Sequence, residues 1–290
     1  MKGLKIVVLA KQVPDTRNVG KDAMKADGTV NRAALPAIFN PEDLNALEQA
    51  LRLKDKIEGT TVHILTMGPG RAAEVIREAM FRGADGGYLL SDRAFAGSDT
   101  LATSYALACA LRNLETDLII CGRQAIDGDT AQVGPQVAEK LHMPQVTYAE
   151  EILSCTDKQL TIKRRLERGV EVVEAPMPCL ITVNGSAAPC RPRNARFVMK
   201  YKYAKAKQEL QNASEECIEL LNKRPYLKLT EWSVNDITCE AKDLGLSGSP
   251  TKVKEIENVV FQAKEAKILE PTDEAIDSMM KELIINHTIG

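Results

Sequence analysis

Residues 117–134 read DLIICGRQAIDGDTAQVG, and this stretch decides the fold. Residues 118–121 form an apolar run that predicts a buried strand ending at Gly122, and residues 130–141 predict a helix. In an open α/β sheet, the loop between the carboxyl end of a strand and the next helix is where ligands bind. Because a helix N-terminus offers free N–H groups to phosphate, we predict a nucleotide pyrophosphate near Asp129, Thr130 and Gln132.

The composition describes an ordinary globular chain of 290 residues, which is long enough for one large domain or two small ones. A net charge of −2 gives no electrostatic reason to expect nucleic acid or an anionic membrane as a partner. No apolar stretch approaches the roughly 20 residues of a membrane span, and the opening MKGLKIVVLAKQ is too short in its apolar part for a signal peptide.

The cysteines and histidines point away from disulfides and metals. The seven cysteines are scattered and contain no CxxC pair, and the three histidines lie far apart. We therefore expect reduced thiols, a cytoplasmic protein and no metal site.

The first half of the chain repeats one pattern. Apolar runs at 4–10, 61–67, 87–90 and 118–121 predict strands, and helical patterns follow each of them. Asn40 precedes a proline and two acids, so we expect it to be the N-cap of a helix. Four strand–loop–helix units predict an α/β fold with a doubly wound, mostly parallel sheet.

The pattern changes after Pro144. Segments 146–153, 159–166, 170–174 and 179–184 predict hairpins that form an antiparallel extension of the sheet. Beyond them we expect an exposed loop at 185–196, a helical region at 204–223, a linker at 244–250 and a helix at 272–283.

Three loops, at 11–15, 67–70 and 122–134, follow parallel strands and should meet at one edge of the sheet. Their glycines permit close approach to a ligand, although they can equally serve only to turn the chain. Neither GxGxxG nor GxxxxGK[ST] is present, so the common dinucleotide and P-loop motifs are excluded.

Two further groups of charged residues each have two interpretations. Asp127 and Asp129 are either Mg²⁺ ligands or helix caps. The lysine run at 200–207, interleaved with Tyr201 and Tyr203, is either a solvated face or a docking surface.

No set of residues suggests an acid, base or nucleophile. A nucleotide site without such groups suits a protein whose cofactor supplies the chemistry. Two classes stay open on these grounds: an electron carrier or redox subunit, and a nucleotide-sensing or hydrolase-like module.

Several segments resemble the beta subunit of electron transfer flavoproteins. They are IVVLAKQVPDT, FNPEDLNALEQAL, LTMGPGRAAEVIREAMFRGAD, CGRQAIDGDTAQVGPQVAEKL, VNGSAAPCRPRNARFVMK and DLGLSGSPTKV. The resemblance implies a fold like that of adenine nucleotide alpha hydrolases. It also implies a heterodimer with an alpha subunit that holds FAD, and a C-terminal arm that embraces that subunit. The division implied is a nucleotide-binding domain at 1–225 and the arm at 226–290.

Within the family, Gly128-Asp129-Thr130-Ala131-Gln132 resembles the group that binds a second FAD in the beta subunit, rather than the group that binds AMP there. That group often takes electrons from NADH and bifurcates them between a flavin-dependent dehydrogenase, here of acyl-CoA type, and ferredoxin or flavodoxin. The chain would then be an electron-transfer subunit of an NADH-dependent oxidoreductase complex. A non-bifurcating shuttle with AMP is the alternative inside the family.

The resemblance assigns roles to individual positions. The residues implied in cofactor binding are Ala10, Lys11, Val13, Asn40, Met67, Gly68, Thr100, Thr103, Arg123, Gln124, Asp129, Thr130, Gln132, Val133 and Gly134. A loop near 190–199 is implied in docking of the dehydrogenase, with Arg193, Phe197 and Met199 as candidates, although the leucine that usually anchors it has no evident equivalent here.

Overall fold

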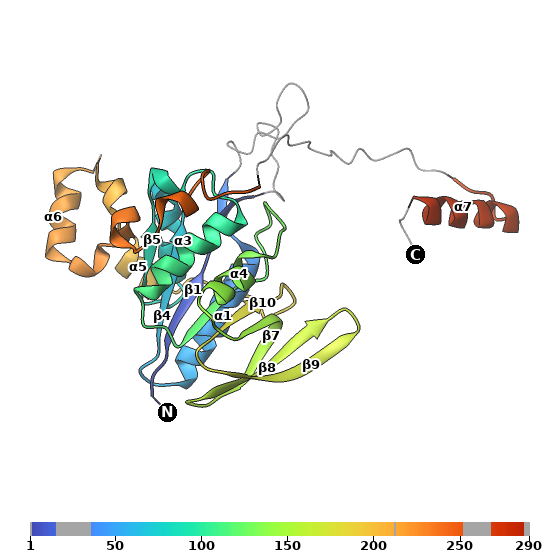
Figure 1. The fold of residues 1–290 in the computed structure, drawn as a ribbon, viewed down its shortest axis with the longest axis horizontal. Helices are drawn as coiled ribbons and strands as arrows, with labels where there is room; N and C mark the ends of the chain where they lie inside the picture. The colour runs from blue at the N-terminus through green and yellow to red at the C-terminus, as the bar shows by residue number, and fades with distance from the viewer. Residues whose placement is uncertain (1, 16–35, 212, 252–267, 287–290) are drawn as a thin grey trace, which may run out of the picture.

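The computed structural model describes residues 2–15, 36–211, 213–251 and 268–286 (Figure 1). Its centre is a nine-stranded sheet in the order β11-β5-β4-β1-β6-β10-β7-β8-β9. Four strands from the first half of the chain lie side by side in this sheet, between β11 and β10. They are β1 (Lys5–Leu9), β4 (Thr61–Met67), β5 (Gly86–Leu90) and β6 (Leu118–Gly122). All of their pairings with one another are parallel, so their carboxyl ends meet at one edge.

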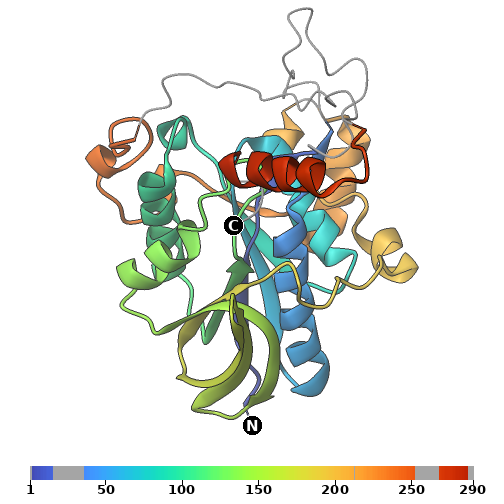
Figure 2. The same cartoon turned by 90° about the vertical axis from the view of Figure 1, so that its right-hand side faces the viewer.

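Helices cover both faces of the sheet because the central strands are apolar on both sides. On β1, Ile6 and Val8 face α1 (Pro41–Lys56) and α2 (Ala73–Met80). Val7 and Leu9 face α3 (Thr100–Arg112) and α4 (Val133–Lys140). Figure 2 shows α1 on one side of the sheet and α3 with α4 on the other. The predicted doubly wound α/β class is confirmed.

The antiparallel extension is also present, but one of the four expected strands does not belong to it. β7 (Gln145–Cys155), β8 (Gln159–Leu166) and β9 (Gly169–Pro176) pair antiparallel in chain order. β10 (Cys179–Val183) instead lies between β6 and the start of β7 and is parallel to both. The expectation that this last segment belongs to a hairpin is wrong, because its five fully buried residues suit a central strand.

Residues 12–14 and 37–39 form a small second sheet. β2 (Gln12–Pro14) pairs antiparallel with β3 (Ala37–Phe39), so Pro14 ends a short strand just after β1. This pairing was not expected from the sequence. It places Asn40 and the start of α1 directly against the loop that leaves β1.

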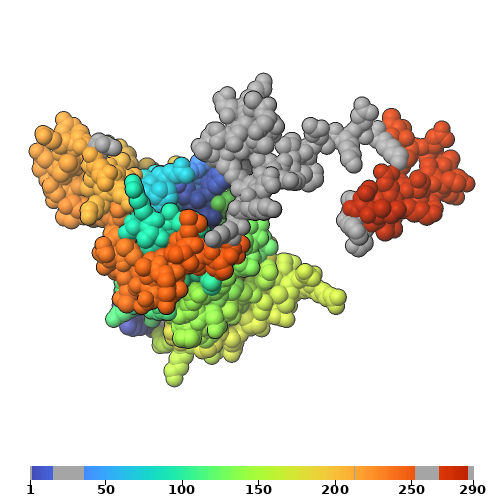
Figure 3. Space-filling view, turned by 45° about the horizontal axis from the view of Figure 1, so that its top comes forward, coloured from blue at the N-terminus to red at the C-terminus, as the bar shows by residue number. Residues whose placement is uncertain are grey.

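The segment after β10 folds back onto the other edge of the sheet. The expected loop at 185–196 runs into α5 (Ala195–Tyr201), and the expected helix at 204–223 consists only of a short 3-10 turn and α6 (Glu215–Lys223). β11 (Thr230–Trp232), which the sequence did not predict, then pairs parallel with β5. Figure 3 shows the α6 region projecting from one end of the body.

Residues 244–250 pack on the body and do not behave as the expected linker. Leu244 and Ser249 are buried, and the Ser249 hydroxyl donates to the backbone oxygen of Gly245 and accepts the N–H of Asp99. The predicted division after residue 225 stays a prediction. The last described element, α7 (Asp273–Ile285), has no buried residue and stands apart from the body in Figure 1. Of the described helices, none has the length and apolar character needed to cross a membrane.

Candidate functional site

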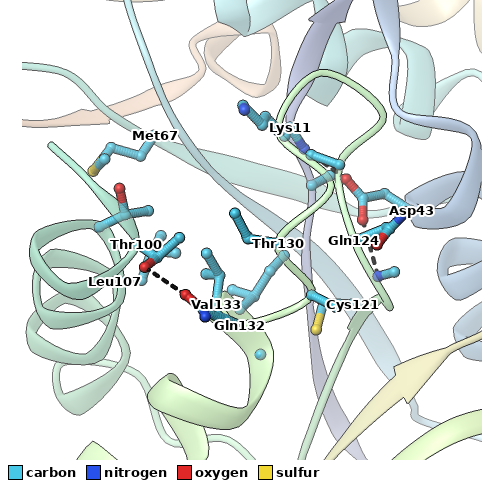
Figure 4. A pocket seen from close by; sticks show the side chains of 18 of the residues that line it. Lys11, Asp43, Met67, Thr100, Leu107, Cys121, Gln124, Thr130, Gln132 and Val133 are labelled. Atoms are coloured by element: carbon cyan, nitrogen blue, oxygen red, sulfur yellow. Dashed lines mark hydrogen bonds between the residues drawn. The ribbon is translucent and has the colours of Figure 1, made fainter. Parts of the chain in front are cut away.

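A cavity of about 410 Å³ opens at the carboxyl edge of the parallel strands. Its size falls within the range of small-molecule sites. Figure 4 shows Met67, Thr100 and Leu107 on one side, Lys11, Asp43 and Gln124 on the other, and Thr130, Gln132 and Val133 between them. The walls come from the ends of β1, β4 and β6, the start of α3, and the loop from β6 to α4.

The first residues of α1 organise the loop that leaves β6. Asn40 is fully buried and occupies the N-cap position, but its side chain makes no capping bond. Its amide instead donates to the backbone oxygen of Gln124 and accepts the N–H of Ile126, at 2.9 and 3.2 Å. The expected N-cap position of Asn40 is confirmed, but its side chain binds the loop at 124–126 and not the first turn of α1, because that loop supplies two backbone groups that the amide satisfies together.

Glu42 holds the same loop through charge. Its carboxylate accepts the N–H of Gln124 at 3.0 Å and forms an ion pair with Arg123, also at 3.0 Å. The Arg123 side chain lines the cavity but is already partnered in this way. Because the Glu42 carboxylate balances its charge, the Arg123 guanidinium adds little net positive charge to the cavity.

Asp43 joins the ends of two neighbouring strands. One carboxylate oxygen accepts the N–H of Lys11 after β1 and the other accepts the N–H of Gly122 at the end of β6, both at 2.9 Å. The side chain is buried in the cavity wall, and burial raises the pKa of Asp43 to about 7 despite these two N–H donors. Sequence reasoning missed this residue because both donors are backbone groups of distant segments.

Side-chain hydrogen bonds hold the loop at 123–131, and two of its residues have strained backbone angles. The Lys11 ammonium bonds both oxygens of Asp127 at 2.8 Å, and the Gln124 amide donates to Asp129 at 2.8 Å. Asp129 and Ala131 have φ angles of 48° and 52°. Non-glycine residues adopt this left-handed conformation at an energetic cost, and they cluster at ligand sites. Asp127 and Asp129, the two candidate Mg²⁺ ligands, thus both have partners within the protein.

Two helix N-termini face the cavity and differ in how they are capped. At α3, Asp99 accepts the N–H groups of Leu101 and Ala102, at 2.9 and 3.0 Å. At α4, the N-cap residue Gln132 makes no side-chain capping bond within the described structure. Its amide oxygen instead accepts the hydroxyl of Thr100 at 3.0 Å. The start of α4 thus keeps N–H groups available to an anion, whereas the start of α3 does not.

Two glycines are required by close packing beneath the cavity. A Cβ on Gly122 would lie 2.5 Å from a carboxylate oxygen of Asp43 and 2.8 Å from the backbone of α1. A Cβ on Gly134 would lie 2.7 Å from the Thr182 methyl group and 2.9 Å from the Cys121 sulfur. Gly128 is different, because a Cβ there would meet nothing within 4 Å.

Comparison with known proteins identifies the family of the chain. A family model described as the electron transfer flavoprotein domain matches residues 27–216. The electron transfer flavoprotein subunit beta of Clostridium acetobutylicum is 40% identical over 99% of this chain and 100% of its own length. The chain belongs to the electron transfer flavoprotein beta-subunit family.

Two further relatives carry names that mention a reductase. The caffeyl-CoA reductase-Etf complex subunit CarD of Acetobacterium woodii is 41% identical over 86% of each chain. The acryloyl-CoA reductase electron transfer subunit gamma of Anaerotignum propionicum is 45% identical, also over 86% of each chain.

Most residues that the flavoprotein resemblance implied in cofactor binding surround the cavity. The lining includes Ala10, Lys11, Met67, Thr100, Thr103, Arg123, Gln124, Asp129, Thr130, Gln132, Val133 and Gly134. Val13, Asn40 and Gly68 lie outside the lining: Val13 and Asn40 are buried, and the N–H of Gly68 donates to Leu90. Residues of the lining that the sequence did not single out include Asp43, Phe95, Ser98, Asp99 and Leu107.

The predicted docking residues of the flavoprotein lie in and just before α5, with unequal exposure. Met199 is 64% exposed, whereas Phe197 packs against the core. The Arg193 guanidinium donates to Glu78 at 3.0 Å, which fixes the loop to α2. Of the three, Met199 is the one with an exposed apolar side chain, and the docking role of this segment stays a prediction.

Proposed function

We propose that the cavity binds FAD and that the chain works in an NADH-dependent, electron-bifurcating electron transfer flavoprotein. In this proposal, it pairs with an alpha subunit that carries a second FAD. The electrons pass to a flavin-dependent dehydrogenase and to a low-potential acceptor such as ferredoxin or flavodoxin. Bound FAD would supply hydride and single-electron chemistry, and the chain would hold and orient it.

The observation that carries this proposal is the two-sided character of the cavity. Met67, Phe95 and Leu107 offer apolar surface that suits a flavin ring. On another side lie the uncapped start of α4 and the strained loop at 129–131, which suit a pyrophosphate. A ligand with a flat apolar part and a doubly charged linker would satisfy both sides.

The residues of the chain have separate tasks in this scheme. Backbone N–H groups at the start of α4, with Thr130 and Gln132 beside them, would hold the pyrophosphate. The bond from Thr100 to Gln132 keeps α3 against α4 and so sets the width of that end of the cavity. Asn40 and Glu42 keep the loop after β6 in place from outside.

The names of two relatives support the dehydrogenase class. Caffeyl-CoA reductase and acryloyl-CoA reductase act on acyl-CoA compounds by their names, so we propose an acyl-CoA-type dehydrogenase as the partner. We also propose a cytoplasmic location, since all seven cysteines are free of disulfides.

The test is the cofactor content of the chain purified together with its alpha subunit. Released nucleotides are separated by chromatography and flavin is measured by absorbance. We expect two FAD per heterodimer, no AMP, and NADH-dependent reduction of ferredoxin. One FAD with one AMP would replace the bifurcating function by a single-electron shuttle, and absence of flavin would favour the nucleotide sensor.

A further inference from the structure

The Asp43 carboxylate is held immobile in the wall of the cavity. It accepts one N–H from Lys11 and one from Gly122, so it is fastened to the ends of both β1 and β6. The whole residue is only 6% exposed. A carboxylate held by two backbone donors on adjacent strands cannot turn away from a ligand that enters the cavity.

No cation neutralises Asp43 among the described ion pairs, although two cations lie nearby in the cavity lining. The Lys11 ammonium is bound to Asp127, and the Arg123 guanidinium is bound to Glu42. The other titratable groups that face Asp43 are Glu42, beside it on α1, and the buried Cys121 thiol on β6. Burial raises the pKa of Cys121, so that thiol stays protonated and adds no charge.

A buried, unpaired negative charge opposes the entry of an anion. Burial has already raised the pKa of Asp43 to about 7, so the free protein exchanges this proton near neutral pH. A bound pyrophosphate adds negative charge in the same cavity and must raise that pKa further. By linkage, the anion then binds more tightly to the protein that carries the proton.

We propose that Asp43 takes up a proton from solvent when an anionic dinucleotide fills the cavity, and thereby couples cofactor binding to pH. This inference rests on the proposed FAD site. It adds Asp43 to that site and states how the affinity for FAD changes with pH. Affinity for FAD should fall as the pH rises above neutrality. The proton leaves again when the cofactor dissociates, so the exchange is reversible and needs no other reactant.

The experiment is calorimetric titration of FAD into the full-length chain, at several pH values and in two buffers of different protonation enthalpy. FAD suits this purpose because its pyrophosphate diester does not titrate in this range. We expect uptake of about half a proton per FAD near pH 7 and almost none near pH 5, where Asp43 is already protonated. Kd should rise by about tenfold between pH 7 and about pH 8.5.

Two variants separate proton exchange from loss of structure. Asp43→Asn is neutral at every pH, so we expect its FAD affinity and proton uptake to show no pH dependence, whatever its affinity at neutral pH. Asp117→Asn is the matched control, because Asp117 accepts the N–H of Lys5 at 2.7 Å and joins β6 to β1 at the opposite edge of the sheet. It should keep the wild-type pH dependence.

The outcomes are distinguishable without relying on either variant. If the wild-type chain binds FAD with no proton uptake near pH 7, the exchange is refuted and the FAD site stands. If Asp43→Asn keeps the wild-type slope, Asp43 is not the group that exchanges. If the wild-type chain binds no FAD at any pH, the same titration of its complex with the alpha subunit decides, because absence of a second FAD there too refutes both the exchange and the proposed function.

Discussion

At the residue scale, the polar side chains that begin α1 serve the cavity more than their own helix. Asn40, Glu42 and Asp43 all accept or donate hydrogen bonds to the loops after β1 and β6. In an ordinary helix, the same residue types would cap the first turn or complement its dipole. These side chains therefore position the two loops around the cavity and do not cap the first turn of α1.

A glycine pair gives a prediction at this scale. Gly134→Ala should lower the free energy of unfolding by about 1–3 kcal/mol, because the new methyl group overlaps Thr182 and Cys121 and moves α4 away from the sheet. The displaced start of α4 should also reduce FAD retention. Gly128→Ala is the control, with a change within about 0.5 kcal/mol since its Cβ has open space. Chemical denaturation measures the stability of both variants, and cofactor content is measured for Gly134→Ala; equal losses of stability in the two variants would contradict the packing account.

Sequence reasoning located the lining of the cavity better than the residues that support it. The loop at 123–134 was predictable because a strand, a glycine-rich turn and a helix follow one another in the chain. Asp43 was not, because its partners, Lys11 and Gly122, lie 32 and 79 residues away and contribute only N–H groups. A side chain that binds distant backbone leaves no spacing pattern in the sequence.

At the element scale, the start of α3 is joined to the chain that follows β11. Asp99 caps α3 with one carboxylate oxygen, while the other accepts the N–H of Thr251 at 3.0 Å. The N–H of Asp99 itself donates to Ser249. Asp99 and Ser98 also line the cavity, so residues 249–251 support one of its walls from behind.

We expect Asp99→Ala to reduce stability and FAD affinity together. Loss of the cap should lower the free energy of unfolding by about 1 kcal/mol, and loss of the bond to Thr251 should loosen the cavity wall. Ser214→Ala removes the cap of α6, which is absent from the cavity lining, and should lower stability alone. Thermal unfolding and FAD titration of both variants check this; an unchanged FAD affinity in Asp99→Ala would disprove the coupling.

A helix or strand could be predicted from the sequence when its own residues carry a repeating apolar pattern. It could not when it depends on contacts with distant segments. The apolar run of β1 and the stripe of α2 identify themselves, because burial on one or both faces repeats along the segment. β11 has only three residues and exists because β5 offers an open edge, which no local pattern records. The 244–250 segment looks like a linker by composition, yet Leu244 and Ser249 are buried and the segment contacts residues 94–99.

At the scale of the whole molecule, α7 is an amphipathic helix without a partner in the described structure. Ile276, Met280 and Ile284 lie four residues apart on one stripe and are 40–53% exposed. An apolar stripe of this kind normally marks a binding surface. The arm that the family resemblance implies for contact with the alpha subunit stays a prediction, and α7 is the element of the arm that we propose to test.

We expect replacement of Ile276, Met280 and Ile284 by serine to abolish copurification with the alpha subunit. The free energy of unfolding of the chain alone should stay within about 0.5 kcal/mol of wild type, because no residue of α7 is buried. The control replaces Asp277 and Lys281, an exposed ion pair on the same helix, with serine and should leave copurification intact. Retention of the alpha subunit by the triple variant would rule out α7 as the arm.

The pairing of β11 with β5 also sets an order of events during synthesis. Thr230 pairs with Tyr88, about 140 residues earlier in the chain, so β5 emerges from the ribosome long before its outer neighbour exists. At the usual translation speeds of about 5–20 residues per second, this edge stays open for on the order of ten seconds. An unpaired strand edge readily recruits other chains. We therefore expect the newborn protein to be most prone to aggregation during that interval, even though β11 covers β5 in the finished sheet.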